Sequence, residues 1–528
     1  MNFLKAMLTV LLSVCLFACD SASNNSDPTL VKVEQGMLRG YVLPNRQVVS
    51  FKGVPFAAPP TGDLRWQPPQ PALAWRGIKV ADDFGHKCMQ NPLFSDMQFR
   101  ASGMSEDCLM LNVWAPVASQ SAPLPVLVYF YGGGFVAGDG SERRYDGASM
   151  AAKGIVTVTV NYRLGLFGFL AHPELSAQSS YGGSGNYGLL DQQAALQWVA
   201  RNIAAFGGDP TRITIAGESA GSMSVSAQML APDSIPHIAG AIAESGSVLG
   251  RMMTSLSEAE EQGQKFAQAL NEDGSTGLQA LRSMSAEQLL SQATEAGFMW
   301  FRPTIDGKIL SAAPQELVER KKFADVPLLA GVNSQEGSYQ QLLGDLEPSV
   351  DNYLSALQKL YPEHYTQVAE LYPASNPEQV KYAAQALMSD RFISASTWAF
   401  IDKVSANGQA DTFYYFYDHV RPALKPELIP EGAEPTQDLG AVHSAEIEYA
   451  MGNLLLNDVF QWQEADHQVS ALMQGYFVNF IKTGQPNDDT LPAWPKFTSN
   501  QLLIIKQQPE SQATDTLRAR YEAMAQIK

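Results

Sequence analysis

A serine flanked by glycines is the residue whose setting points most clearly to chemistry. It lies in Gly217-Glu218-Ser219-Ala220-Gly221, which fits the G-x-S-x-G pattern and occurs once in the chain. A β-branched run over 213–215 precedes it and a helix-compatible segment follows, which is the context of a nucleophile elbow. This context disfavours the alternative, a plain Gly/Ser turn. A neutral hydroxyl is a poor nucleophile, so Ser219 needs a base to take its proton and an acid to orient that base.

Five histidines follow the serine and could supply the base: His237, His364, His419, His443 and His467. His364 and His467 lie in polar helical surroundings, where surface roles are usual, and His237 lies just ahead of a strand. His419 follows a strand and His443 lies in a loop. Residue context alone therefore leaves both His419 and His443 as candidates.

Three carboxylates are candidates for the acid. Glu336 lies at the C-terminal end of a predicted strand over 326–332, where open sheets place catalytic groups. Asp306 in Ile305-Asp306-Gly307 is its rival, although a turn aspartate is the preferred interpretation of that residue. We interpret Glu218, beside the nucleophile, as an electrostatic or structural partner.

A run of three glycines offers a place for the oxyanion. Residues 126–130 are continuously apolar, which is typical of a strand buried on both faces, and they lead into Tyr131-Gly132-Gly133-Gly134-Phe135. Without side chains in the way, backbone N–H groups of such a loop can face a substrate. A flexible linker is the alternative, and the apolar residues on both sides disfavour it.

The elements that must position these groups alternate between strands and helices. The pattern predicts strands over 126–130, 155–160, 213–215, 238–243, 326–332 and 412–417, a helix over 188–206, and mostly helical segments over 255–296 and 350–405. The proline-dense stretch 51–60 predicts an irregular loop, since proline blocks both a helix and a strand ladder. We expect an α/β fold with a large, mostly parallel sheet, flanking helices and helical insertions that cap the site.

Composition allows one large packed domain. The chain has 528 residues, of which 45% are hydrophobic and 17% are charged, so global disorder is excluded. The formal net charge of −18 argues against nucleic acid as a partner, because phosphate binding needs a basic face. Such a charge could steer cationic substrates, although solubility is the plainer interpretation.

The N-terminus has the features of a targeting segment. Lys5 precedes an apolar stretch over 6–18 that is too short to span a bilayer, and Cys19 follows it. This resembles a bacterial lipoprotein signal; an ordinary secretory peptide is the alternative. We expect a signal peptide over 1–18, a lipidated Cys19, a flexible tether over 19–29 and a single domain over 30–528.

Cys88 and Cys108 are then an even pair in an exported chain, which predicts one disulfide.

Separated motifs together resemble one enzyme family. The segment Ser105-Glu106-Asp107-Cys108-Leu109-Met110-Leu111-Asn112-Val113-Trp114 resembles the second signature of the type-B carboxylesterases, which have the α/β-hydrolase fold and include the cholinesterases. The elbow, the three-glycine loop and the segment around His443 (Gly-x-x-His, then Glu-Ile-Glu) resemble the same family in the same order. The resemblance covers residues 30–497.

The resemblance implies roles for individual residues. It implies a triad of Ser219, Glu336 and His443, an oxyanion hole of Gly133, Gly134 and Ala220, the Cys88–Cys108 pairing, a structural Arg65–Glu106 salt bridge, and pocket candidates Met299, Trp300 and Phe301. Two positions depart from the family pattern. Tyr131 stands where relatives often have histidine, and the segment between the two cysteines contains no tryptophan, which disfavours choline esters.

These inferences predict a serine carboxylesterase that acts on a small-molecule ester through an acyl-enzyme. No His/Asp/Cys cluster has ligand spacing, so we expect no metal and no cofactor. We expect a monomer or weak homo-oligomer that meets a membrane only through its lipid anchor. A lipase acting on longer-chain esters is one alternative. A catalytically silent binding or adhesion protein of the same fold is another, which the presence of all three triad residues disfavours.

Overall fold

A single large sheet organises the chain. The computed structural model describes residues 27–45, 47–117, 122–250, 252–429, 438–497 and 500–527. Within these residues eleven strands form one sheet in the order β16-β15-β14-β13-β10-β9-β7-β8-β6-β4-β3. Their bounds are β3 Tyr41–Val42, β4 Val48–Pro55, β6 Met110–Pro116, β7 Leu124–Phe130, β8 Val156–Val160, β9 Gly208–Glu218, β10 Gly240–Glu244, β13 Leu328–Asn333, β14 Thr412–Tyr417, β15 Gln501–Ile505 and β16 Glu510–Ala513.

The centre of the sheet is parallel and its edges are antiparallel. Strands β8, β7, β9, β10, β13, β14 and β15 pair in parallel, whereas β3, β4, β6 and β16 add antiparallel pairs at the two sides. The central strands are buried almost throughout, as their continuous apolar runs predict. The predicted α/β class with a mostly parallel sheet is confirmed.

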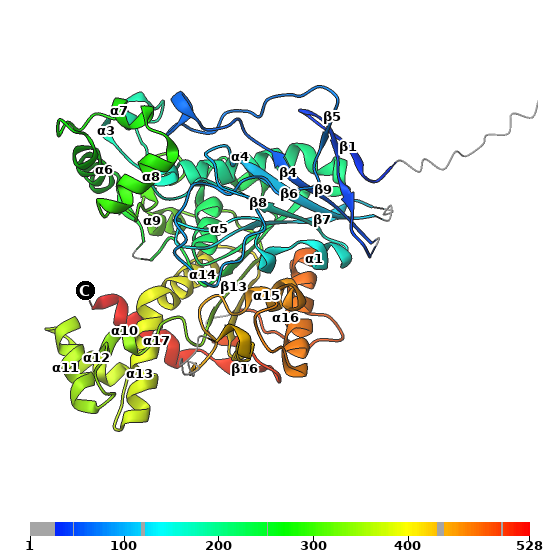
Figure 1. Cartoon of the computed structure of the whole chain (residues 1–528). Coiled ribbons are helices and arrows are strands. Elements are labelled where there is room, and N and C mark those ends of the chain that lie inside the picture. Colours follow the sequence, from blue (N-terminus) through cyan, green and yellow to red (C-terminus); the bar gives the residue numbers. More distant parts are fainter. Residues whose placement is uncertain are drawn as a thin grey trace, which may run out of the picture.

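Helices cover both faces of this sheet. Figure 1 shows α4 (Tyr187–Asn202) on one side and α1 (Ala148–Ala152) with α16 (Glu464–Thr483) on the other. The elbow helix α5 (Ala220–Leu230) packs against β9 and β10. The remaining helices of the main body are α2 Gly165–Phe169, α3 Pro173–Gln178, α9 Pro314–Glu319, α14 Ala395–Asn407 and α15 Ile447–Met451.

Two helical insertions extend from the sheet. The first contains α6 (Leu256–Leu270), α7 (Gln279–Ser283) and α8 (Ala286–Glu295), as the amphipathic pattern predicts. The second, the helical lobe, contains α10 Gln340–Leu343, α11 Val350–Leu360, α12 Tyr365–Leu371 and α13 Pro377–Ser389. Figure 1 shows this lobe at one end of the molecule beside the C-terminal helix α17 (Asp515–Gln526), whose end packs into the lobe's own apolar core.

The amino-terminal part adds smaller strands and one correction. Strands β1 (Leu30–Val33), β2 (Gly36–Arg39) and β5 (Ile78–Val80) form a separate sheet, and β11 (Thr254–Ser255) pairs with β12 (Thr304–Ile305). The prediction of an irregular loop over 51–60 is wrong for its first half, because β4 continues to Pro55 with a register shift between Phe51 and Val54. Pro55 is the last residue of the strand, so its missing N–H interrupts little of the ladder.

The predictions for the extreme N-terminus lie outside the described residues. The signal peptide, the lipidated Cys19 and most of the tether fall within residues 1–26, and they stay predictions. Among the residues that the structure describes, none of the helices combines the length and the apolar character that a membrane crossing requires.

Candidate active site

Ser219 lies at a sharp junction between a strand and a helix. It follows the last residue of β9 and precedes the first residue of α5, with φ 57° and ψ −119°. A Cβ on Gly217 would come within 2.5 Å of the Phe130 carbonyl oxygen, and a Cβ on Gly221 within 2.1 Å of the same atom. Both glycines are therefore required by the close approach of β7 to this turn. Ser219 therefore lies on the sharp strand-to-helix turn that the motif predicts.

His443 reaches Ser219 from a loop far along the chain. Its Nε2 lies 2.9 Å from Ser219 Oγ, and its side chain is 26% exposed. The loop is tied to the end of β13 by a parallel bridge between Gln335 and Val442, and Asn333 Nδ2 donates to the Val442 carbonyl at 2.8 Å. These contacts hold the imidazole beside the serine.

Glu336 holds the other side of the imidazole. Its Oε2 lies 2.5 Å from His443 Nδ1. Its Oε1 accepts hydrogen bonds from the Asn333 N–H at 2.7 Å and the Ser245 hydroxyl at 2.5 Å. With Oε1 occupied, Oε2 is oriented towards the histidine, which favours the tautomer that has its accepting nitrogen towards Ser219. Sequence reasoning did not identify Ser245, because only the fold brings the end of β10 beside Glu336.

The rival candidates lie elsewhere. Asp306 Oδ1 accepts from the N–H groups of Lys308, Ile309 and Leu310, so it is the turn aspartate that we preferred. His419 Nε2 lies 2.8 Å from Asp466 Oδ1, and no contact with Ser219 is found for it among the described residues.

The three-glycine loop lies directly against the elbow. A Cβ on Gly132 would come within 3.2 Å of the Ser219 Cβ. Gly133 and Gly134 have φ values of 100° and 63°, which turn the backbone in a way that side-chain-bearing residues rarely adopt. Within the described chain, the N–H groups of Gly133, Gly134 and Ala220 donate no hydrogen bond. Ala220 begins α5, so its N–H also carries the positive end of the helix dipole.

Backbone strain is concentrated around these groups. Six non-glycine residues of the described chain have positive φ, and four of them are Phe135, Ser219, Ser245 and Ser444. They are the residue after the glycine loop, the serine of the strand-to-helix turn, the serine bonded to Glu336 and the residue after His443. Such conformations cost on the order of 1–3 kcal/mol each and persist only where the surroundings enforce them. Their clustering indicates that the fold holds this region in one geometry.

Three buried glutamates lie near Ser219 and His443. Glu218, Glu244 and Glu446 are at most 2% exposed, and burial raises the pKa of each of them. Glu218 Oε1 lies 3.2 Å from His443 Nε2. Burial lowers the pKa of His443, but the charges of Glu218 and Glu336 raise it by more, so this pKa lies above its ordinary value. The carboxylates beside His443 therefore stabilise the charged form of its imidazole.

The pocket candidates lie in different places. Trp300 is 42% exposed, and its ring lies 3.0 Å from where a Cβ on Gly134 would be. Met299 lines a small cavity with Gln90 and Val136. Phe301 is 2% exposed and packs edge-on against Phe266 at 5.6 Å, which places it in the core of the first insertion. Of the three, Trp300 lies against the three-glycine loop.

Two residues near the site were not identified from the sequence. The ring of Phe392, 47% exposed, packs edge-on against His443 with a centroid distance of 5.1 Å. It lies in a π-helical turn, Asp390–Ser394, and such turns are frequent at functional sites. Met97 Cε lies 2.9 Å from where a Cβ on Gly133 would be. No local motif marks either residue.

The two pairings implied by the resemblance are present. Cys88 and Cys108 form a disulfide with a Cα–Cα distance of 5.0 Å. The Arg65 guanidinium contacts Glu106 through two hydrogen bonds of 2.7 and 2.6 Å. The disulfide closes the segment between the two cysteines, which carries Met97.

Comparison with known proteins gives a consistent result. Residues 27–524 match the model of the carboxylesterase family. Fumonisin B1 esterase of Sphingopyxis macrogoltabida is 34% identical over 494 residues, which covers 90% of this chain and 86% of that protein. Acetylcholinesterase of Electrophorus electricus is 32% identical over 572 residues, with 95% and 88% covered. Cocaine esterase of Oryctolagus cuniculus is 33% identical over 490 residues, with 88% of each chain covered.

Proposed function

The chain belongs to the carboxylesterase family and is a carboxylic ester hydrolase, and we propose that it works through an acyl-enzyme intermediate on Ser219. The observation that carries this proposal is the continuous contact from Ser219 Oγ to His443 Nε2 and from His443 Nδ1 to Glu336 Oε2. It supplies a nucleophile, a base and an orienting acid in the arrangement that serine hydrolysis needs.

In the first half-reaction the serine is acylated. Ser219 Oγ attacks the ester carbonyl carbon while His443 Nε2 takes its proton, and Glu336 stabilises the imidazolium. The carbonyl oxygen becomes an oxyanion that accepts hydrogen bonds from the free N–H groups of Gly133, Gly134 and Ala220. The C–O bond to the alcohol then breaks, and the alcohol leaves with the proton from His443.

In the second half-reaction water replaces the alcohol. His443 takes a proton from the water as its oxygen attacks the acyl carbon, and the same three N–H groups hold the second oxyanion. The bond to Ser219 Oγ breaks, the serine regains its proton from His443, and the carboxylic acid is released.

The relatives indicate how far the substrate can be assigned. Their names refer to fumonisin B1, acetylcholine and cocaine, which share a carboxylic ester bond. We assign that bond as the target. We propose that choline esters are poor substrates here, since the segment between the cysteines brings Met97, and no tryptophan, to the glycine loop.

Burst kinetics test the proposed mechanism. A p-nitrophenyl ester mixed with the enzyme should release one nitrophenolate per active site in a fast phase before steady turnover. The Ser219→Ala variant should lose the burst and about 10⁴-fold or more of kcat, since the residual rate comes from binding and the oxyanion hole alone. Turnover by this variant at the wild-type rate would refute the assignment of the nucleophile.

We also propose that the chain is exported and held to a membrane by lipid on Cys19. The support is the apolar stretch over 6–18 ahead of this cysteine, together with a disulfide that is typical of oxidising compartments. In bacterial cells fed labelled palmitate, the full chain should take up label and the Cys19→Ala variant should not. Equal labelling of the two chains would contradict the anchor.

A further inference from the structure

The residue after the base has a conformation that non-glycine residues rarely adopt. Ser444 has φ 65°, in the left-handed region, and it directly follows His443. Because the two residues share a peptide unit, a change in the Ser444 backbone would redirect the loop on one side of the imidazole. Contacts that hold Ser444 therefore also hold His443.

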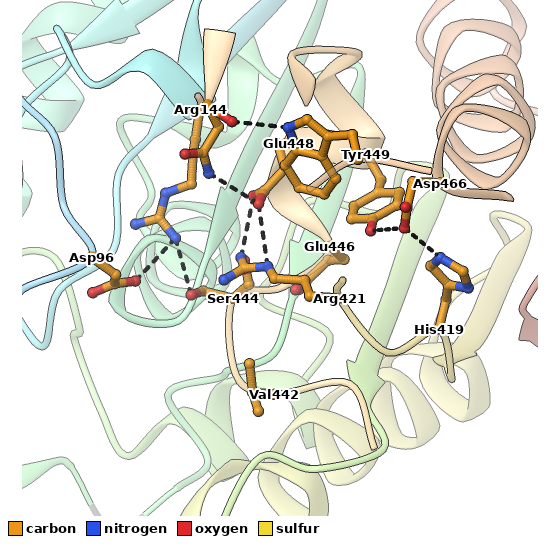
Figure 2. A network of polar contacts seen from close by, with 12 residues as sticks. Asp96, Arg144, His419, Arg421, Val442, Ser444, Glu446, Glu448, Tyr449 and Asp466 are labelled. Carbon is orange, nitrogen blue, oxygen red and sulfur yellow. Dashed lines mark hydrogen bonds and ion pairs between the residues drawn. The ribbon is translucent and has the colours of Figure 1, made fainter. Parts of the chain in front are cut away.

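Arg144 contacts the side chain of Ser444. Its Nη1 donates a hydrogen bond of 3.1 Å to Ser444 Oγ (Figure 2). Arg144 belongs to the short turn Arg143–Tyr145, which follows the glycine loop in the sequence. The Arg144 side chain is 4% exposed, and its Nε donates to Glu142 Oε1 at 2.5 Å. A buried guanidinium that is fixed by a carboxylate presents its remaining donors in a set direction. Arg144 can therefore fix the position of the serine hydroxyl.

Arg421 contacts the carbonyl of the same residue. Its Nη2 donates to the Ser444 carbonyl oxygen at 2.8 Å and to Glu448 Oε2 at 3.2 Å. The Arg421 side chain is 9% exposed, Glu448 is fully buried, and the guanidinium lies over the Phe460 ring at 5.1 Å. Figure 2 shows both arginines directed at the segment that carries Ser444.

The contact also reaches the segment between the two cysteines. Arg144 Nη1 lies 3.4 Å from Oδ2 of Asp96, whose side chain is 51% exposed. The next residue, Met97, lies against the glycine loop. One buried arginine thus connects the oxyanion side of the site to the loop of the base.

We propose that Arg144 and Arg421 clamp Ser444 from two sides and act as positioning residues for His443 in ester hydrolysis. Each arginine makes a charge-assisted hydrogen bond to a different polar group of Ser444. The two hydrogen bonds together enforce a backbone conformation that this residue would otherwise leave. The clamp rests on the function proposed above. A purely structural role would lower stability and leave the rate of each folded molecule unchanged.

The acylation rate constant separates these roles. We would measure the fast phase with p-nitrophenyl acetate for the wild type and Arg144→Met, with the folded fraction set by circular dichroism and the number of sites by burst amplitude. Arg144→Met should keep an amplitude of one per folded molecule and lose on the order of 10-fold or more in acylation rate, because a small displacement of a reacting group has a large effect on rate. Arg421→Met should act in the same direction.

Arg65→Met is the matched control. Arg65 is also a buried arginine, paired with Glu106 and bonded to the Leu281 and Met284 carbonyls, and none of these partners adjoins His443. This variant should have a lower melting temperature and acylate within about twofold of the wild-type rate, as expected of a structural ion pair away from the site.

Ser444→Ala keeps the test decisive if Arg144→Met does not fold. This variant removes one oxygen and should slow acylation. Where Arg144→Met folds, the double variant Ser444→Ala/Arg144→Met should be no slower than Arg144→Met, since both changes break the same hydrogen bond. Ser444→Ala or a folded Arg144→Met that acylates at the wild-type rate would overturn the clamp. A wild type that forms no covalent acyl adduct on Ser219, as read by mass spectrometry after acid quenching, would overturn the acyl-enzyme itself, so the two failures are distinguishable.

Discussion

Ser219 and His443 meet across 2.9 Å, but the chain holds them in different ways. Ser219 is held by backbone close to it: the end of β9, the start of α5, two glycines and the Glu244 carbonyl, which accepts from the Ser219 N–H at 2.9 Å. His443 is held by side chains and strand ends from distant parts of the sequence, including Glu336, Asn333 and the arginines around Ser444.

The difference concerns how each side can fail. Both sides contain a non-glycine residue at positive φ, Ser219 on one and Ser444 on the other. On the Ser219 side the strained backbone depends on two glycines, because without Cβ atoms they let the strands and the helix approach closely. On the base side it is enforced by the presence of side-chain groups that can be removed one at a time. We therefore expect a substitution on the Ser219 side to abolish activity, and single substitutions on the His443 side to reduce it only in part.

The largest effect should come from Gly221→Ala. The added Cβ would meet the Phe130 carbonyl oxygen at 2.1 Å, so either β7 or the elbow must move. We expect a loss of stability of about 4–5 kcal/mol or more and no measurable ester hydrolysis, because the shift displaces Ser219 itself. Urea unfolding and nitrophenyl ester assays would measure both effects.

Gly277→Ala provides the matched control. Its added Cβ would have Glu174 Oε1 as its nearest neighbour at 3.5 Å, which is an ordinary contact. This variant should keep wild-type stability within about 0.5 kcal/mol. A Gly221→Ala enzyme that folded and hydrolysed esters at the wild-type rate would show that the turn adapts, and the contrast between the two sides would be lost. The arginine variants of the base side should lie between these extremes.

The same contrast explains which parts of the site the sequence could predict. The elbow and the glycine loop are continuous in sequence, and their glycines are visible because close backbone approach requires them. Residue context placed Glu336 at a strand end. It left both His419 and His443 as candidates for the base, and the resemblance to a family decided between them. Arg144 and Ser245 carry no local signal, because their partners are brought to them only by the fold.

The fold was predictable to a similar extent. Long apolar runs such as 126–130 and the helix over 188–206 were recognised, since burial on both faces and helical periodicity leave clear patterns. The continuation of β4 to Pro55 was missed, because whether a proline ends a strand or excludes it depends on the pairing partner, here β6. The local residue pattern predicts which segments form strands and helices, whereas the pairing of a strand with its neighbours decides where it ends.

The smallest effect should come from substitution of Glu218, which lies beside His443. Its Oε1 lies 3.2 Å from His443 Nε2, and its charge is the strongest of those that raise the pKa of the imidazole. Burial raises the pKa of Glu218 as well, so the charge that it places beside His443 depends on pH. Because only the neutral imidazole can accept the Ser219 proton, kcat/KM should rise with pH as His443 releases its proton.

Glu218→Gln should therefore move the acid limb of kcat/KM to lower pH. The amide has no charge to stabilise the imidazolium, so the pKa of His443 falls and the neutral base forms earlier, by about 1 pH unit or more. The plateau at high pH should change by less than about tenfold, since the triad contacts remain. Glu446→Gln, which removes a weaker influence on the same pKa, should shift the limb in the same direction by less. An acid limb that stayed in place in Glu218→Gln would mean that Glu218 carries its proton throughout and contributes no charge to the pKa of His443.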